Sequence, residues 1–303
     1  MGLSDDLLTV LAPHLDRPLV VVDVGARWGC GEGWSALQDK LKVYGIEPDA
    51  EECDRLQAIA PPSTQYVAAA FAEQPGTRVL HLTREPACSS LIPPDPVLSR
   101  SFGELECTTE VGSSEIRVER LDDWATHAGV APIDALKIDV QGEELSVLRG
   151  SGELLGDMQV VDVEVEFNPI YEGQPLFGDV DRHLRDHGFS LWRLRQLVHY
   201  SPASLPGPAL PTFDSHIFDS VRSLPAAGGG QLFWSMATYV RHEHTFASET
   251  PVTMDEAARA AASALGFGAI DFALTVLERA SLGPDGVAVQ SLRDAVRRLS
   301  GLE

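Results

Sequence analysis

Acidic residues stand at the ends of two apolar segments in the middle of the chain. Asp139 ends the run "IDALKID", and Glu164 and Glu166 alternate with apolar residues in the later run "VVDVEVEF". Open α/β sheets bind their ligands at the carboxyl ends of parallel strands, so Asp139 is placed to orient or deprotonate an acceptor hydroxyl. Alternation puts Glu164 and Glu166 on one face of their strand, and buried carboxylates are costly unless paired or beside water. We therefore expect at least one of them to face an active site.

Each of these acids also has a structural explanation. Asp139 could cap the helix expected over residues 142–149, a role compatible with catalysis. One of Glu164 and Glu166 could pair with Lys137 of the neighbouring strand. Together with Asp139, the two glutamates could also hold a divalent metal through oxygen ligands, but no motif requires a metal and none is expected.

A glycine turn follows the first apolar run, in "VVDVGARWGCGEG". Gly25 and Gly29 let the backbone approach a ligand closely, and Asp23 ends the strand just before them. Glu47 lies 22 positions beyond Gly25, at the end of the next expected strand, where an acid accepts hydrogen bonds from both hydroxyls of a ribose. The spacing is neither the dinucleotide fingerprint nor a P-loop, which disfavours a nicotinamide-linked oxidoreductase.

The histidines and cysteines form no convincing ligand set. His183 and His187 lie four positions apart on an expected helix, and His242 and His244 lie on one face of an expected strand end. Without a third ligand at a telling distance, solvated surface histidines are the better interpretation. The four cysteines are scattered and are expected to be reduced thiols packed as small apolar groups.

Strands alternate with helices over most of the chain, which indicates an α/β protein with a parallel sheet covered on both faces. Two late segments, 188–194 and 231–241, are expected to pair as antiparallel strands at one edge. The long connection between them contains a run of three glycines and is expected to act as a lid. From about residue 252 the chain becomes alanine-rich with helical spacing, so we expect a main domain over residues 1–245 and a helical extension over residues 246–303.

Seven sequence blocks, in order, resemble the FkbM-type family of S-adenosylmethionine-dependent methyltransferases: "VVDVGARWG", "GIEPD", "SSLIPP", "VERLDDW", "IDALKIDVQGEELSVLRG", "VEVEFNPIY" and "GGGQLFWSMATYVR". The resemblance implies a Rossmann-like class I methyltransferase sheet of seven strands, six parallel and one antiparallel, with a helical C-terminal appendage. It also implies transfer of a methyl group from S-adenosyl-L-methionine to a hydroxyl, often on a sugar, glycan, glycosylated compound or polyketide.

The resemblance also assigns site residues. The cofactor-binding residues that it implies are Asp23, Gly25, Ala26, Gly29, Glu47, Pro48, Ala69, Ser89 and Asp139, and the catalytic residues are Asp139, Glu164 and Glu166. The chain departs from the family pattern at Arg27, where Asn is common, and at Met236, near which an acid is common.

The composition restricts the partners. There are 23 Lys and Arg against 45 Asp and Glu, a net charge of -22, so nucleic acids and anionic membranes would be repelled. No apolar run is long enough to span a membrane and the first residues lack a secretion signal, so we expect a cytoplasmic protein acting on a small-molecule or glycan acceptor. A homo-oligomer is compatible with the sequence. The alternative function is a catalytically silent protein that binds S-adenosylmethionine and works as an interaction module.

Overall fold

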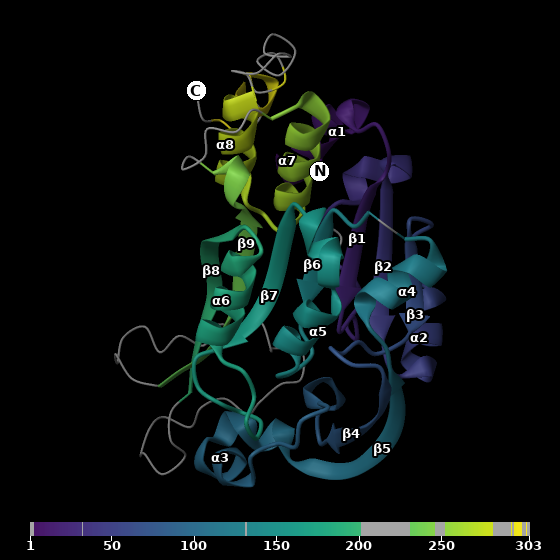
Figure 1. Cartoon of the computed structure of the whole chain (residues 1–303), viewed down its shortest axis with the longest axis vertical. Helices are drawn as coiled ribbons and strands as arrows, with labels where there is room; N and C mark the ends of the chain where they lie inside the picture. Colours follow the sequence, from purple (N-terminus) through teal and green to yellow (C-terminus); the bar gives the residue numbers. More distant parts are fainter. Residues whose placement is uncertain are drawn as a thin grey trace.

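The fold is built on one central sheet of seven strands (Figure 1). The computed structural model describes residues 3–31, 33–130, 132–200, 231–245, 252–280, 292, 294–298 and 301. The strands of this sheet are β1 (Leu19–Val24), β2 (Leu41–Glu47), β3 (Thr64–Ala68), β6 (Ala135–Ile138), β7 (Val160–Glu166), β8 (Phe189–Tyr200) and β9 (Gln231–Arg241).

Their order across the sheet is β3-β2-β1-β6-β7-β9-β8, and β9 alone runs antiparallel to its neighbours. The expected sheet of six parallel strands and one antiparallel strand is therefore confirmed, as is the antiparallel pair at its edge. Valine-rich strands suit the middle of this sheet, because helices cover both faces of a parallel sheet and bury the side chains on each face. All seven residues of β7 are buried.

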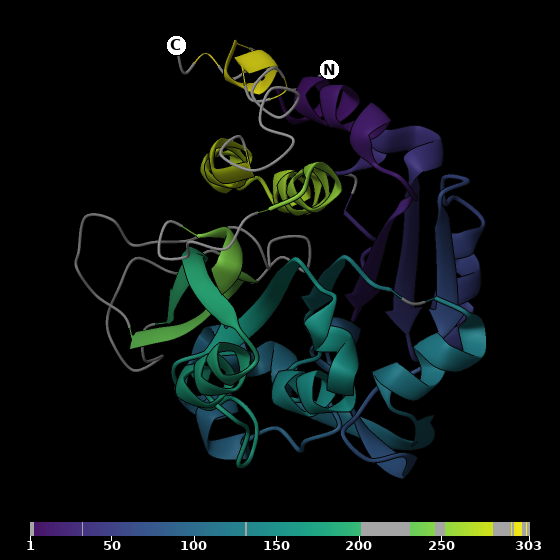
Figure 2. The same ribbon diagram turned by 45° about the horizontal axis from the view of Figure 1, so that its top comes forward.

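Helices cover the two faces of the sheet in two groups. The helices α4 (Leu121–Ala128), α5 (Glu144–Gly150) and α6 (Phe177–Asp186) lie in front of the sheet in Figure 1 and share a core with the apolar side chains of β1, β6 and β7. On the other face lie α1 (Leu3–Leu11), α7 (Met254–Gly266) and α8 (Ile270–Ala280), seen at the top of Figure 2. The remaining helical segments of this body are η1 (Ala12–His14), η2 (Ser35–Lys40), α2 (Ala50–Gln57), η5 (Gly152–Gly156) and η7 (His242–His244).

An insertion between β3 and α4 forms a second, smaller sheet beyond the carboxyl ends of the parallel strands, at the bottom of Figure 1. It pairs β4 (Gly76–Thr83) with β5 (Glu110–Val118) in antiparallel fashion, and η3 (Pro86–Cys88), α3 (Pro96–Ser101) and η4 (Gly103–Thr108) connect them. The proline and serine content of residues 87–103, "ACSSLIPPDPVLSRSFG", predicts a loop here. Short helices form instead because Glu85 and Asp95 cap the first turns of η3 and α3, and each of these helices starts with a proline.

The C-terminal helices pack tightly on the rest of the chain. A capping box between Thr253 and Glu256 starts α7, whose alanines let it approach α1 and β1 closely within one shared core. At its end, Gly266 lies against Trp34, so closely that a Cβ atom there would be 1.8 Å from the indole ring. The boundary expected at residue 245 adjoins residues 246–251, which lie outside the described ranges, so the division into two units stays a prediction.

Candidate active site

A cavity of about 940 Å³ opens at the carboxyl ends of the parallel strands and continues along the sheet face that carries α7. Ligand sites commonly measure roughly 300–1,000 Å³, so this cavity lies at the upper end of that range. Most of the predicted site residues line it, namely Asp23, Gly25, Gly29, Glu47, Pro48, Ala69, Ser89, Asp139 and Glu164. Ala26 and Glu166 do not line it: Ala26 is buried in the turn, and Glu166 is buried beside Glu144 and Glu164, of which Glu164 reaches the cavity.

The glycine turn is held against both neighbouring strands. Gly25 has a φ of +87°, and the backbone N–H groups of Gly25 and Ala26 both donate to the carbonyl of Ile46, at 3.0 Å. A Cβ atom on Gly25 would lie 1.8 Å from the carbonyl oxygen of Asp139. Only glycine satisfies both conditions, so the turn brings the end of β1 into contact with the chain after β6.

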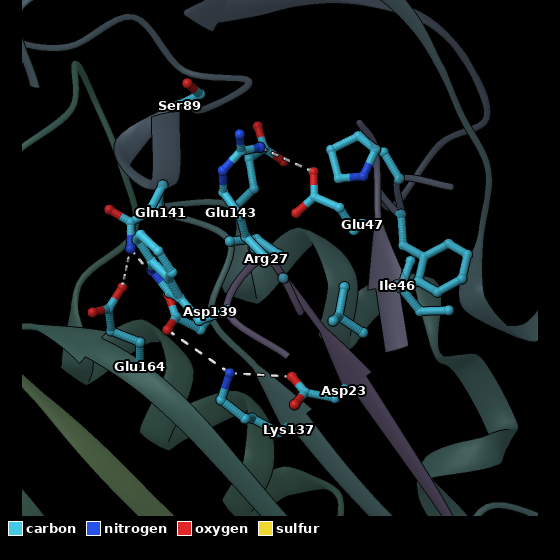
Figure 3. A pocket seen from close by; sticks show the side chains of 18 of the residues that line it. Asp23, Arg27, Ile46, Glu47, Ser89, Lys137, Asp139, Gln141, Glu143 and Glu164 are labelled. Atoms are coloured by element: carbon cyan, nitrogen blue, oxygen red, sulfur yellow. Dashed lines mark hydrogen bonds and ion pairs between the residues drawn. The ribbon is translucent and has the colours of Figure 1, made fainter. Parts of the chain in front are cut away.

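Glu47 stands at the end of β2 beside an arginine that the sequence analysis did not include in the site (Figure 3). Only 4% of Glu47 is exposed, and its Oε1 accepts the N–H of Asp49 at 2.9 Å. Burial raises the pKa of Glu47, and the Asp49 N–H and the charge of Arg27 oppose that rise. The Arg27 guanidinium lies 3.5 Å from Glu47 and 3.4 Å from Asp49, so the departure from the family pattern lies at the expected ribose site.

A row of charged residues crosses the middle of the sheet along the floor of the cavity. Asp23, Lys137 and Asp162 are register partners on β1, β6 and β7. Lys137 Nζ lies 3.1 Å from Asp23 and 3.9 Å from Asp139 (Figure 3), while Asp162 pairs with Arg195 of β8. Burial disfavours the charged form of Lys137, but the negative charges of Asp23 and Asp139 outweigh this effect of burial and raise the pKa of Lys137. The expectation that Lys137 pairs with Glu164 or Glu166 is wrong, because the register places it opposite Asp23.

Asp139 does not cap a helix. The helix α5 begins at Glu144 with Glu143 at its N-cap position, and the Glu144 carboxylate accepts the N–H groups of Val140 and Gly142. The capping explanation for Asp139 is therefore wrong, because Glu144 of α5, and not Asp139, accepts the backbone N–H groups of the turn between β6 and α5. About a third of the Asp139 side chain is exposed, 32%, and it lies on the cavity wall.

Gln141 joins the two predicted catalytic acids that reach the cavity (Figure 3). Its Nε2 donates to Asp139 Oδ1 at 2.9 Å and to Glu164 Oε2 at 3.0 Å. The sequence analysis did not select Gln141 as a site residue, since a glutamine within an apolar and acidic motif carries no distinctive spacing. The contact depends on Glu164, 23 positions away on β7.

Behind the cavity wall, Glu144, Glu164 and Glu166 place carboxylate oxygens within 4.8 Å of one another, all of them buried. Burial, and then the charges of neighbouring carboxylates, raise the pKa of Glu164 and of Glu166 well above the usual range, and the pKa of Glu144 rises to about 7. Three oxygen ligands could accept a divalent cation, but acids packed this closely are also accommodated by holding protons.

The inserted β4–β5 sheet supplies an apolar wall opposite the glycine turn. Leu80, Leu82, Val111 and Ile116 line the cavity from this sheet. An ion pair between Arg78 and Glu143, at 2.9 Å, connects the sheet to the chain that precedes α5. The predicted lid over residues 200–230 lies outside the described residues except for Tyr200.

The histidines occupy other places. His183 lies on α6 and His187 follows its end, with their rings 4.2 Å apart beside a second, smaller cavity. Burial lowers the pKa of His183. His242 and His244 lie in η7, after β9 has ended, so the strand-end prediction for them is wrong. The prediction of a solvated surface histidine is also wrong for His244, which is 3% exposed and lies 2.7 Å from Gln159 Oε1. The four cysteines are free, and all but Cys30 are buried. Among the described helices none is long and apolar enough to cross a membrane.

Comparisons with known proteins agree with this arrangement. A model of the methyltransferase FkbM domain matches residues 23–191. The 2-O-methyltransferase NoeI of Sinorhizobium fredii (strain NBRC 101917 / NGR234) is 27% identical over 175 residues, which cover 53% of this chain and 69% of that protein.

Two solved structures match this chain at low similarity. Magnesium protoporphyrin IX methyltransferase (ChlM) from Synechocystis PCC 6803 with bound SAM is 12% identical, with 78% of this chain and 76% of that chain covered and a TM-score of 0.34. An S-adenosylmethionine-dependent methyltransferase from Mesorhizobium loti is 14% identical, with coverages of 76% and 95% and a TM-score of 0.33. Neither similarity is high enough to support an argument about this site.

Proposed function

Because the chain belongs to the FkbM family of methyltransferases, which take their methyl group from S-adenosylmethionine, we propose that it methylates a hydroxyl group of a small-molecule or glycan acceptor. The observation that carries this proposal is the pair of carboxylates, Asp139 and Glu164, on the wall of the cavity. A hydroxyl is a poor nucleophile until its proton is removed, and carboxylates are suitable acceptors for that proton. The relative named as a 2-O-methyltransferase supports an oxygen acceptor. The acceptor class that we propose is a sugar, glycosylated or polyketide compound.

The residues present fit the cofactor. Gly25 and Gly29, both at positive φ, line the cavity without side chains, so the main chain of the turn can approach a ligand closely, and Glu47 offers a buried carboxylate at the end of the next strand. The cavity lining holds seven acidic residues and three basic ones, Arg27, Lys137 and Arg195. This excess of negative charge suits a cationic sulfonium ligand that carries no phosphate. We assign the methionine end to Asp23, Gly25 and Gly29, and the ribose to Glu47.

The chain's own groups would act on the acceptor. S-adenosylmethionine supplies an electrophilic methyl group. The acceptor oxygen forms the new bond to that carbon, the sulfur keeps the electron pair of the broken bond, and the hydroxyl proton must pass to the protein. Asp139 is exposed to the cavity and would accept the hydrogen bond that orients the hydroxyl. Glu164, on the same wall, would take the proton in its ionised form, and Glu166 would act through Glu164, which it approaches within the carboxyl cluster.

The test is transfer of a labelled methyl group. The purified protein should transfer label from S-adenosylmethionine to a hydroxyl of a compound in a fractionated metabolite extract, and NMR of the product should show an O-methyl group. Asp139→Asn and Glu164→Gln should lower turnover at least about 100-fold, whereas Asp54→Asn, on the exposed side of α2, should not change it. Methylation at nitrogen or carbon would contradict the proposal. Cofactor binding without transfer to any fraction would instead identify a catalytically silent binding protein.

A further inference from the structure

The amide of Gln141 lies between the two carboxylates of the cavity wall. Its Nε2 carries two hydrogens, and the two acceptors nearest to it are Asp139 Oδ1, at 2.9 Å, and Glu164 Oε2, at 3.0 Å. One neutral side chain therefore donates to both acids at once. The nearby cation, Lys137, is 3.9 Å from Asp139 and is paired with Asp23.

The two carboxylates determine the orientation of this amide, because turning it over would place its oxygen against two carboxylate oxygens. On the other side, the hydroxyl of Tyr171, a side chain with 1% exposure, lies 2.9 Å from Gln141 Oε1 and 2.7 Å from the carbonyl oxygen of Cys88. These two oxygens compete for the single hydrogen of the hydroxyl.

The backbone of Gln141 is also held in place. Its φ of +60° lies in the left-handed region, which a residue with a side chain adopts only where its surroundings require it. Ser90, 1% exposed, donates its hydroxyl to the Gln141 carbonyl at 2.7 Å. The insertion thus holds the backbone through Ser90, and the loop after β7 holds the side chain through Tyr171.

We propose that Gln141 is a positioning residue for methyl transfer: its amide fixes the orientation of the Asp139 and Glu164 carboxyl groups and favours the ionised form of Glu164, which accepts a proton from the acceptor. The inference rests on the proposed function, since it concerns the base of that reaction. Two carboxylates beside each other repel, and the pair relieves the repulsion by retaining a proton. Two donated N–H groups stabilise the charged form of the pair without adding a positive charge. The other titratable groups that interact with the pair come from every element around it, namely Lys137 of β6, Asp23 of β1, Glu144 of α5, Glu166 of β7, Cys88 of η3, Tyr171 after β7 and Tyr200 of β8.

The experiment compares Gln141→Met, which keeps the length of the side chain and removes the donor, with Gln141→Glu, which replaces the donor by a third acid. Both should move the pH profile of kcat to higher pH, by about one unit for Gln141→Met and by more for Gln141→Glu. For Gln141→Met this shift lowers kcat about tenfold at neutral pH, and most of the lost kcat returns at high pH. The KM for S-adenosylmethionine should not change. The matched control is Gln38→Met, at an exposed glutamine with a φ of +50° outside the cavity.

A second measurement does not need an acceptor. Carbon NMR of the protein labelled at Asp and Glu carboxyls follows the titration of the pair directly, and Gln141→Met should raise its apparent midpoint. An unchanged midpoint, or an equal loss of kcat at every pH, would overturn the inference. If the wild type methylates no hydroxyl, the proposed function fails, and the NMR midpoint still decides whether Gln141 controls the pair.

Discussion

Gly25 and Asp139 are in direct backbone contact: a Cβ atom on Gly25 would lie 1.8 Å from the Asp139 carbonyl oxygen. The contact joins the turn that we assign to the cofactor to the residue that we assign to the acceptor. The two halves of the proposed reaction are therefore held at a set separation by main-chain atoms, which vary less in position than side chains do.

Gly25→Ala should lower the free energy of unfolding by more than about 3 kcal/mol. The new Cβ atom collides with main chain rather than with a flexible side chain, and a φ of +87° is itself unfavourable for alanine. Urea unfolding measures the loss. Gly31→Ala, in the same turn, meets no atom within 4 Å and should change stability by less than about 1 kcal/mol. Equal losses for the two variants would contradict the role of the contact.

Glu47→Ala should weaken S-adenosylmethionine binding by about 10- to 100-fold, which corresponds to the loss of hydrogen bonds to a charged group. Isothermal titration of the purified protein measures the affinity. Glu51→Ala is the control, because Glu51 is an exposed acid of the adjacent helix α2. An affinity that does not change in Glu47→Ala would show that the ribose is bound elsewhere.

Lys137→Met should destabilise the fold by about 3–5 kcal/mol, since it leaves Asp23, which is 4% exposed, without its cation. Adding Asp23→Asn removes the uncompensated charge and should restore at least half of the loss. Lys42→Met, at an exposed lysine of the adjacent strand β2, should cost little. If the double variant is no more stable than Lys137→Met, the loss of the ion pair does not explain the destabilisation.

The stability of the wild type should fall as the pH rises from about 5 to about 8. The pKa of Glu144 is raised to about 7 by burial, against 4.5 for an ordinary glutamate. The folded state therefore holds a proton that the unfolded state has lost, so this contribution is complete below pH 4.5 and disappears as the pH passes 7. Glu164 and Glu166 act in the same direction.

Glu144→Gln should accordingly make the pH dependence of stability shallower, by at most about 1.4 kcal/mol per pH unit. Its stability at pH 5 should be lower than that of the wild type, since glutamine cannot accept N–H groups at both terminal atoms as Glu144 does. Urea unfolding at several pH values provides the slopes. Glu115→Gln, an exposed acid of β5, should keep the wild-type slope. A wild-type slope in Glu144→Gln would contradict this explanation.

Leu82→Ser and Val111→Ser should raise the KM of acceptors that carry an apolar group about 5- to 30-fold. Both side chains line the cavity and are still 36% and 66% exposed, so an apolar ligand would cover them and gain about 1–2 kcal/mol. Affinity for S-adenosylmethionine should not change. Ile59→Ser is the matched control, as Ile59 is 73% exposed and does not line the cavity. Unchanged KM values would place the acceptor away from the β4–β5 sheet.

Local pattern was sufficient for a parallel sheet covered on both faces, with an antiparallel pair at its edge, and for bringing the residues that we assign to the cofactor to one end of it. Valine-rich segments predict buried strands, and the glycines after β1 and the acid after β2 follow from where a parallel sheet ends its strands. Asp23, Gly25 and Glu47 therefore lie where they were expected, on the wall of one cavity. The short helices of the insertion were not predicted, because a sequence rich in proline and serine fits a loop as well as a capped turn.

The sequence by itself determined the alternation of strands and helices and the shared face of Glu164 and Glu166. It also determined which acids and glycines stand at the strand ends. The tertiary structure decided which of these groups meet. Lys137 faces Asp23 instead of the glutamates, Gln141 bridges Asp139 and Glu164, and Glu166 is separated from the cavity. The reason is register: alternation specifies a face, but the height of one strand against the next depends on packing across the whole sheet, and a shift of one residue would exchange the faces.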